Sequence, residues 1–364
     1  MIKLIHAADL HLDAPFSALP PEQAAQRRGE QRQLLFDLAS LANREGAELV
    51  LLAGDLFDGA DIHPETLEAL AEALGSIRGR VFIAPGNHDY WSARSPYATA
   101  QWPENVRIFP GEALEAVDLP ELGCVIHGAA FRGESRTDRV LKGVHVPEDG
   151  KLHIGLLHGE VAPESRYCPI PLEDIGASGL DYLALGHIHA GSGLQKAGNT
   201  AWAYPGCTEG RGFDELGEKG ALLVRVEKGA VEAEFRPLCR RRYLVREVDV
   251  TDRDPAEALM AALPAEQSGD LCRFVLTGER GLDRLDLNAL EKLAAGRYYA
   301  AVVRDHTRIR RDRWARAGEN TLTGLFLREM RRRLDEAGDG PEREKLELAV
   351  RFGLAALENR EDPR

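Results

Sequence analysis

Seven side chains of metal-binding type occur in five separate short segments of this sequence. They are carboxylates, imidazoles and one amide: Asp9, His11, Asp55, Asn87, His158, His187 and His189. Imidazole, carboxylate and amide donors without any thiolate suit manganese, with iron or zinc as alternatives. Two such ions, about 3.5–4 Å apart, stabilise the attacking and leaving oxygens of an in-line displacement at phosphorus. The donor set therefore predicts hydrolysis of a phosphate ester at a site with two divalent ions.

Each of the five segments follows a short apolar run that is typical of a buried strand. The runs cover residues 2–5, 49–53, 81–84, 153–157 and 182–185. In open α/β sheets, ligands bind beyond the carboxyl ends of such strands. We therefore expect the seven side chains to converge at these strand ends.

The order of the donors suggests how two ions share them. Asp55 opens the central loop and is the expected bridging carboxylate. Asp9, His11 and His189 complete one ion's shell in this hypothesis, and Asn87, His158 and His187 complete the other's. His88 follows a ligand directly, so its side chain must point elsewhere and is left free for catalysis. It is the candidate that protonates the departing alkoxide or stabilises phosphoryl charge, with Asp89 as a candidate orienting carboxylate.

The amino-acid sequences of these segments resemble the motifs of a known family. The runs Ala-Ala-Asp-Leu-His-Leu at 7–12, Ala-Gly-Asp-Leu-Phe-Asp at 53–58, Gly-Asn-His-Asp at 86–89 and Gly-His-Ile-His at 186–189 resemble those of calcineurin-like metallophosphoesterases. The first two are similar to the opening motifs of SbcD-type DNA repair exonucleases. Tyr-Pro-Gly at 204–206 and the segment 211–220 are similar to the YhaO-like subgroup. The resemblance covers residues 1–240 and implies the same seven ligands and the same role for His88.

Apolar runs and helical patterns alternate over residues 1–236, which predicts an α/β fold with a β-sandwich flanked by helices. The first two helices are expected over residues 30–44 and 64–77, with residues 15–29 as a surface loop. Beyond residue 240, alternating strands and helices predict a small α/β cap domain. We divide the chain into a metallophosphoesterase domain over residues 1–238, a cap over 239–316 and a C-terminal helical segment over 317–364.

Composition limits the class of protein and its compartment. The chain of 364 residues has a formal net charge of −13, which by itself disfavours a polyanion partner. Its five cysteines are widely spaced, so neither a disulfide framework nor a cysteine zinc site is expected. The N-terminus runs into the first strand without a signal-like apolar stretch, and no run approaches a membrane span. We expect a cytoplasmic protein that does not contact membranes.

The C-terminal third suggests partners. Residues 297–333 contain eleven arginines, no lysine and four acids, a local charge of +7. Arginine favours specific bidentate contacts, so this segment could contact DNA backbone or an acidic partner; a merely solvated basic face is the alternative. Helices expected over residues 321–337 and 341–359 have apolar faces that either pack on the cap or dock a partner.

The resemblance implies a partner for these helices. SbcD-like nucleases use such helices to bind an SMC-like ATPase, here of SbcC or YhaN type. This sequence contains no Gly-x4-Gly-Lys-Ser/Thr loop, so any ATP dependence must come from another subunit. A homodimer is implied by the resemblance alone.

Three functions remain open at this point. The leading hypothesis is a hydrolase that acts as a manganese-dependent DNA exonuclease, with endonuclease activity also open, in repair or recombination with the ATPase. The alternative is a phosphodiesterase or phosphatase for small substrates, although such an enzyme would not need residues 240–364. A binding scaffold without catalysis is disfavoured because all seven ligands and His88 are present.

Overall fold

The computed structural model describes residues 1–59, 62–280, 285–309, 314–337 and 340–357. The chain forms two compact units. The first comprises residues 1–246, 263–274 and 291–303, and the second comprises residues 247–262, 275–290 and the described residues from 304 onward. The three-part division expected from the sequence stays a prediction.

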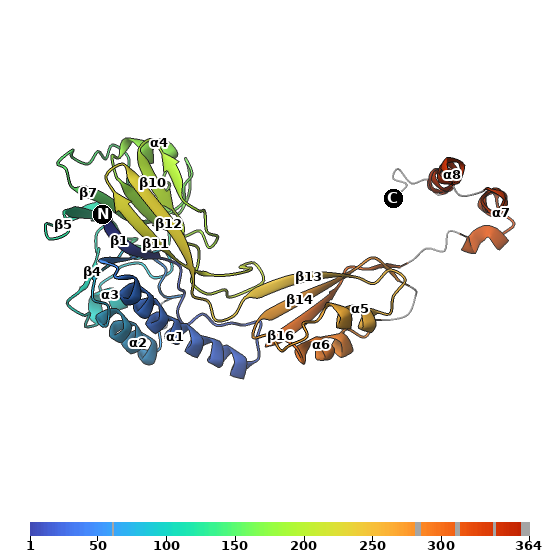
Figure 1. The fold of residues 1–364 in the computed structure, drawn as a ribbon, viewed down its shortest axis with the longest axis horizontal. Coiled ribbons are helices and arrows are strands. Elements are labelled where there is room, and N and C mark those ends of the chain that lie inside the picture. Colours follow the sequence, from blue (N-terminus) through green and yellow to red (C-terminus); the bar gives the residue numbers. More distant parts are fainter. Residues whose placement is uncertain (60–61, 281–284, 310–313, 338–339, 358–364) are drawn as a thin grey trace. The chain divides into compact units, whose positions relative to one another are not determined.

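Two six-stranded sheets form the body of the first unit (Figure 1). The first sheet has the order β12 (Ala230–Pro237), β11 (Gly220–Glu227), β1 (Ile2–Ala7), β2 (Leu49–Leu52), β3 (Arg80–Ile83) and β4 (Val106–Ile108). The second has the order β5 (Glu115–Leu119), β6 (Cys124–Gly128), β7 (Leu152–His158), β8 (Tyr182–Gly186), β10 (Thr200–Ala203) and β9 (Gln195–Ala197). Strands β1 to β4 are mutually parallel, and so are β6, β7, β8 and β10.

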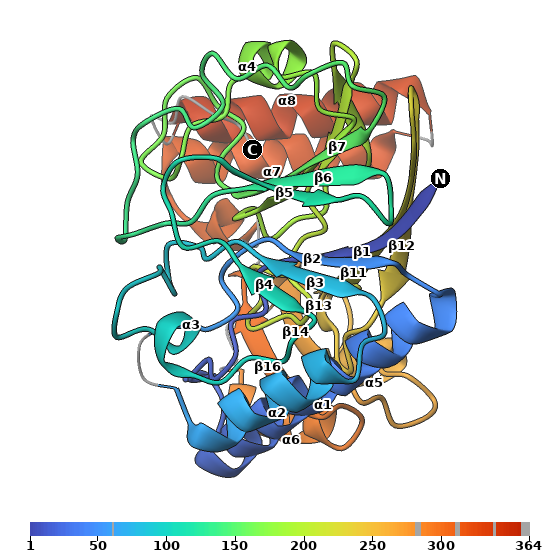
Figure 2. The same cartoon turned by 90° about the vertical axis from the view of Figure 1, so that its left-hand side faces the viewer.

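Alternate side chains of each central strand enter two different cores. In β1, Ile2 and Leu4 join a core that also contains Ile154 and Leu156 of the second sheet. Ile5 belongs instead to the core that α1 (Pro21–Glu45) and α2 (Pro64–Gly75) form with the first sheet. Figure 2 shows these two helices on the outer face of that sheet. The apolar runs are continuous because the strands are buried on both faces. The predicted helix-flanked α/β sandwich is confirmed.

Helix α1 begins earlier than the sequence pattern indicated. Residues 21–29, expected to be a surface loop, form its first turns. Pro21 occupies the first helical turn, where its missing N–H costs nothing. The buried face of these turns includes Arg27 and continues to Gln31, each at most 2% exposed. The sequence shows no apolar periodicity in this part of the helix, because its buried face includes polar side chains.

Several short elements lacked a sequence signal. Strands β4, β5 and β9 extend the sheet edges, and α3 (Pro96–Thr99) and α4 (Leu172–Ala177) are each a turn or two long. All five cysteines are free, as expected. None of the helices in the described ranges is long and apolar enough to cross a bilayer.

The C-terminal third contains the expected alternation. Strands β13 (Tyr243–Asp249), β14 (Leu271–Thr277) and β16 (Ala300–Asp305) form a three-stranded sheet. Helices α5 (Pro255–Ala262) and α6 (Leu287–Ala295) connect them, and β15 (Glu279–Arg280) pairs with β17 (Arg308–Ile309). The 3₁₀ helix η1 (Ala315–Gly318) precedes α7 (Leu322–Glu336) and α8 (Pro341–Leu357). The last two residues of the helix expected over 341–359 lie outside the described ranges.

Candidate metal centre

All seven predicted donors lie at the carboxyl ends of parallel strands. Asp9 and His11 follow β1, Asp55 follows β2, Asn87 follows β3, His158 ends β7, and His187 and His189 follow β8. Three of these strands belong to the first sheet and two to the second. The site is thus assembled at one end of the sandwich from both of its sheets.

The loops after β1 and β2 run side by side beyond the strands themselves. The amide of Asp9 donates to the Gly54 carbonyl over 3.0 Å, and that of His11 donates to the Asp55 carbonyl over 3.0 Å. Leu12 continues the pattern with the Leu56 carbonyl at 2.8 Å. This extended parallel pairing brings the carboxylates of Asp9 and Asp55 into one buried centre.

Four of the seven donors have a positive backbone φ. The angles are 53° at Asp9, 43° at His11, 51° at Asp55 and 106° at His187. Such conformations cost non-glycine residues roughly 1–3 kcal/mol each, and they persist only where the surrounding structure enforces them. Their concentration among the donors indicates that donor placement outweighed local backbone preference.

Two glycines in the motifs are required by close approach. Gly54 has a φ of +82°, and a Cβ there would lie 2.5 Å from Nδ1 of His158. A Cβ on Gly86 would collide with the Asp55 carboxylate and lie 2.6 Å from the Asp55 amide nitrogen. The Gly-Asp and Gly-Asn pairs therefore let neighbouring loops approach the donors more closely than any side chain would permit.

The deepest part of the site contains Asp9, Asp55 and His158. The two aspartates are 0% and 1% exposed, and in the described part of the chain their ion-pair partners are histidines. His158 Nε2 lies 3.4 Å from Asp55 Oδ2 and 3.0 Å from Asn87 Oδ1. Its Nδ1 donates to the Ala53 carbonyl over 2.9 Å. Two carboxylates buried without lysine or arginine partners indicate a place for cations.

The pKa values of this group reflect the same shortage of positive charge. Burial raises the pKa of Asp9 to about 7. Burial would also raise the pKa of Asp55, but the adjacent His158 outweighs burial and lowers it well below its usual range. Burial disfavours charge on His158, yet attraction to Asp55 raises the pKa of this imidazole to about 9. Protons thus hold the positive charge that divalent cations would supply.

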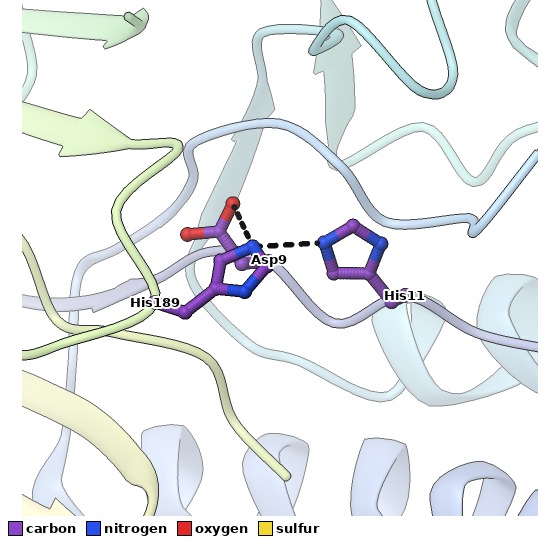
Figure 3. A group of neighbouring side chains, drawn as sticks. All are labelled: Asp9, His11 and His189. Atoms are coloured by element: carbon purple, nitrogen blue, oxygen red, sulfur yellow. Dashed lines mark hydrogen bonds and ion pairs between the residues drawn. The ribbon is translucent and has the colours of Figure 1, made fainter. Parts of the chain in front are cut away.

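His11 and His189 face each other in front of Asp9. Their Nε2 atoms are 3.2 Å apart, and Nε2 of His189 lies 4.0 Å from Asp9 Oδ1 (Figure 3). Nδ1 of His11 is 3.0 Å from Asp58 Oδ1, and Nδ1 of His189 is 2.7 Å from Glu215 Oε1. A carboxylate accepts and does not donate, so each Nδ1 carries a proton in these contacts, and Nε2 is the ring nitrogen left to offer a lone pair. Two lone pairs and a carboxylate directed at one point fit a divalent cation.

His187 lies beside the buried group. Its backbone amide donates to Asp9 Oδ1 over 3.0 Å, and its ring centroid is 5.2 Å from that of His158. On its other side the Tyr167 ring centroid is 4.8 Å away. Burial, with repulsion from His158, lowers the pKa of His187 to about 4. The imidazole is therefore neutral near pH 7, as a metal ligand must be.

His88 is the exposed member of the site. Its amide donates to Asp55 Oδ1 over 3.0 Å, its Nδ1 is 3.3 Å from the Asp58 carbonyl, and its ring centroid is 4.9 Å from that of His11. Asp89 does not orient this ring, contrary to the sequence hypothesis. The Asp89 carboxylate accepts from the amides of Gly86, Leu56 and Phe57 and from the Tyr97 hydroxyl.

The reason for the Asp89 correction is geometric. Its amide partners belong to the loops after β2 and β3, so the Asp89 carboxylate joins these two loops through hydrogen bonds. Burial, with repulsion from Asp55, raises the pKa of Asp89. Asp89 therefore has a structural role, and the group that contacts the His88 ring is the Asp58 carbonyl.

Sequence analysis assigned no role to Asp58, Arg211 or Glu215. Asp58 ends the Gly-Asp-Leu-Phe-Asp run, and the other two belong to the Arg-Gly-Phe-Asp-Glu run at 211–215, which was used only as a mark of resemblance. A short polar motif between strands β10 and β11 was the available signal. Its partners Asp58 and His189 could not be inferred, because they follow β2 and β8, far away in the sequence.

A comparison with protein families now identifies the fold. The family model for calcineurin-like phosphoesterases matches residues 2–191, which include every donor from Asp9 to His189. The chain belongs to this family. The resemblance inferred from the motifs is thereby confirmed, and the protein is a metallophosphoesterase whose family binds divalent metals.

Relatives within the metallophosphoesterases extend the likeness. YhaO of Bacillus subtilis, described as an uncharacterised metallophosphoesterase, is 34% identical over 71% of this chain and 65% of its own length. The DNA double-strand break repair protein Mre11 of Aeropyrum pernix is 26% identical over 69% of this chain and 64% of its own. One component of the nuclease SbcCD from Staphylococcus epidermidis is 23% identical over 76% of this chain and 79% of its own length. The chain thus spans just under two thirds of the first two relatives.

Proposed function

We propose that this metallophosphoesterase is a nuclease that hydrolyses phosphodiester bonds in DNA, as an exonuclease with endonuclease activity left open. The observation that carries the proposal is the grouping of Asp9, His11 and His189, and of Asp9, Asp55 and His158, at the strand ends. Buried acids without lysine or arginine partners in the described part of the chain suit metal ions, and the exposed His88 beside them supplies a group for proton transfer.

In this proposal two divalent ions would be held by the seven donors. Asp9, His11 and His189 would hold one of them, Asn87, His158 and His187 would hold the other, and Asp55 would serve both. When bound, the ions stabilise charge on the phosphoryl oxygens and lower the pKa of a water nucleophile. In three of the histidine donors, Nδ1 is bound by a group outside the donor set. His11 contacts Asp58, His189 contacts Glu215, and His158 contacts the Ala53 carbonyl. These contacts fix the tautomer that leaves Nε2 available.

His88 acts as the general acid in the proposal. In the contact between His88 Nδ1 and the Asp58 carbonyl, Nδ1 must be the donor, because a carbonyl oxygen accepts hydrogen bonds but does not donate them. When the ring is protonated, the second proton is therefore on Nε2. From there it passes to the oxygen of the leaving group as the P–O bond breaks. Asp58 is the residue that positions this proton.

DNA is proposed as substrate because of the relatives' names, which include a nuclease component and a DNA break repair protein. The basic segment at 297–333 gives less support than expected. Arg332 pairs with Glu329 and Glu336, Arg333 pairs with Glu329, and Arg316 pairs with Glu319. Arg310, Arg311 and Arg313 lie outside the described ranges. These internal ion pairs favour the alternative hypothesis for this segment, a basic face that is merely solvated.

An SMC-like ATPase of SbcC or YhaN type is proposed as partner, with docking on α7 and α8. These helices pack on each other through Leu327, Met330 and Val350. The opposite side chains stay exposed: Leu322 is 70%, Leu325 58%, Leu348 48% and Phe352 57% exposed. Apolar side chains that are this exposed at helical spacing suit a helical partner. A homodimer remains an expectation from the resemblance.

A comparison of two substrates tests the function. Manganese-loaded protein is incubated with end-labelled linear duplex DNA and with bis-p-nitrophenyl phosphate, with and without the ATPase and ATP. Cleavage of DNA supports the nuclease and gives its polarity. Hydrolysis of the small diester alone, even with the partner present, would favour a phosphodiesterase for small substrates. Binding of DNA without hydrolysis of either substrate in any metal would favour a scaffold.

A further inference from the structure

One guanidinium connects the two carboxylates that orient His11 and His189. Nη1 of Arg211 donates to Asp58 Oδ1 over 2.8 Å, and Nη2 donates to Glu215 Oε1 over 2.8 Å. The Arg211 backbone amide also donates to Glu215 Oε2, over 2.8 Å. Arg211 thus contacts both carboxylates at the same oxygens that accept from the two imidazoles.

The contact between Arg211 and His189 supports this arrangement. Nη2 of Arg211 lies 3.1 Å from Nδ1 of His189, while Glu215 Oε1 is closer to that nitrogen, at 2.7 Å. Arginine only donates, so Nδ1 cannot accept from it while donating to Glu215. The shorter, charge-assisted bond to Glu215 prevails, and Arg211 approaches His189 because both donate to the same oxygen.

The loop that carries Arg211 is held firmly from behind. Glu209, 1% exposed, pairs with the buried guanidinium of Arg27 in α1 and accepts from the amide of Arg240. On the other side, the amide of Cys207 donates to the His189 carbonyl over 3.2 Å. Arg211 therefore projects from a loop that is fixed on both sides, which is what a positioning residue requires.

The other donor group is oriented by different means. Nδ1 of His158 is held by the Ala53 carbonyl, a backbone group that no side-chain change removes. Neither Asp58 nor Glu215 contacts His158 in the described part of the chain. A change at Arg211 therefore acts on one half of the donor set.

We propose that Arg211 is the positioning residue for one of the two cation sites, because it clamps Asp58 and Glu215 behind His11 and His189. It fixes the affinity of the ion held by Asp9, His11 and His189 and leaves the ion at Asn87, His158 and His187 unaffected. This inference rests on the proposed two-ion function. It adds that the two sites depend on different parts of the chain.

The test is a manganese titration of metal-stripped protein by calorimetry, with bound manganese counted by elemental analysis. Wild-type protein is expected to bind two ions. In Arg211→Met, one ion is expected to bind roughly 10–100-fold more weakly and the other with unchanged affinity, as for the loss of partners behind a metal ligand. Activity should recover when the manganese concentration is raised, because the remaining groups are intact.

The matched control is Arg139→Met. Arg139 also joins two carboxylates, Glu173 and Asp174, and its side chain is 29% exposed against 22% for Arg211. It lies away from the donors, so both ions should bind as in wild type. Arg211→Lys keeps the charge but loses the planar fork, so it is expected to fall between wild type and Arg211→Met.

Each outcome decides the question. Equal weakening of both ions, or no weakening in Arg211→Met, overturns the inference. If Arg211→Met does not fold, as judged by circular dichroism, Arg211→Lys carries the test, and wild-type affinity for both ions in that variant overturns the inference. Wild-type protein that binds no metal would instead defeat the proposed function itself.

Discussion

The backbone-held and the side-chain-held halves of the candidate metal centre are built in different ways. Asp9, Asp55 and His158 are fixed mainly by backbone groups, including the paired loops after β1 and β2 and the Ala53 carbonyl. His11 and His189 are oriented by side chains, namely Asp58, Glu215 and, behind both, Arg211. The first arrangement follows from strand order, whereas the second depends on a loop that comes later in the chain.

The two halves differ in their tolerance of substitution. Backbone contacts survive most side-chain changes, so the backbone-held half is expected to fail when a donor is replaced or when Gly54 or Gly86 gains a side chain. The half that side chains orient also loses function when a residue with no contact to the ion changes. The comparison predicts effects of decreasing size from the centre outward.

The largest effect is expected at Asp55, where the two halves meet. Asp55→Asn keeps the shape but removes the charge that pairs with His158 and His11. We expect hydrolysis to fall below detection and bound manganese, counted by elemental analysis, to fall below two per chain. Asp138→Asn is the control, since that carboxylate is 67% exposed and pairs only with Arg136 among the described residues. Two bound ions in Asp55→Asn would show that the Asp55 carboxylate is not needed to hold either ion.

A smaller effect is expected at His88, which belongs to neither half. His88→Asn should lower kcat by roughly 10²–10⁴-fold, the usual contribution of a general acid, while two manganese ions remain bound. His145→Asn is a close control, because Nδ1 of this exposed ring is also held by a backbone carbonyl, that of Ala177, at 2.9 Å. Turnover at the wild-type rate would remove His88 from the mechanism.

The last effect concerns pH and reports on the protons of Asp9 and His158. A cation must displace protons from Asp9, with a pKa of about 7, and from His158, with a pKa of about 9. Affinity should therefore fall by about tenfold per unit as pH drops from 9 to 7, and more steeply below 7. Burial lowers the pKa of His11, so this ring releases no proton when an ion binds. Calorimetry in buffers of different ionisation enthalpy counts the released protons, and a flat pH profile would contradict the assignment.

Sequence reasoning succeeded where strands impose the geometry. The apolar runs predicted the strands before Asp9, Asp55, Asn87 and His187, and parallel strands bring their carboxyl ends together. It failed where polar groups act without periodicity. The first turns of α1 bury the polar side chain of Arg27, and Asp89 accepts hydrogen bonds from loop amides instead of orienting His88. Arg211 and Glu215 were visible as a motif, but their partners lie far away in the chain.

The positive φ angles of Asp9, His11, Asp55 and His187 have a consequence for ion choice. Folding has already placed these donors in unfavourable backbone conformations, so little ordering remains to be done when an ion arrives. Such preorganisation makes the centre discriminate by size and coordination geometry, since a rigid frame adapts poorly to an ion of the wrong radius.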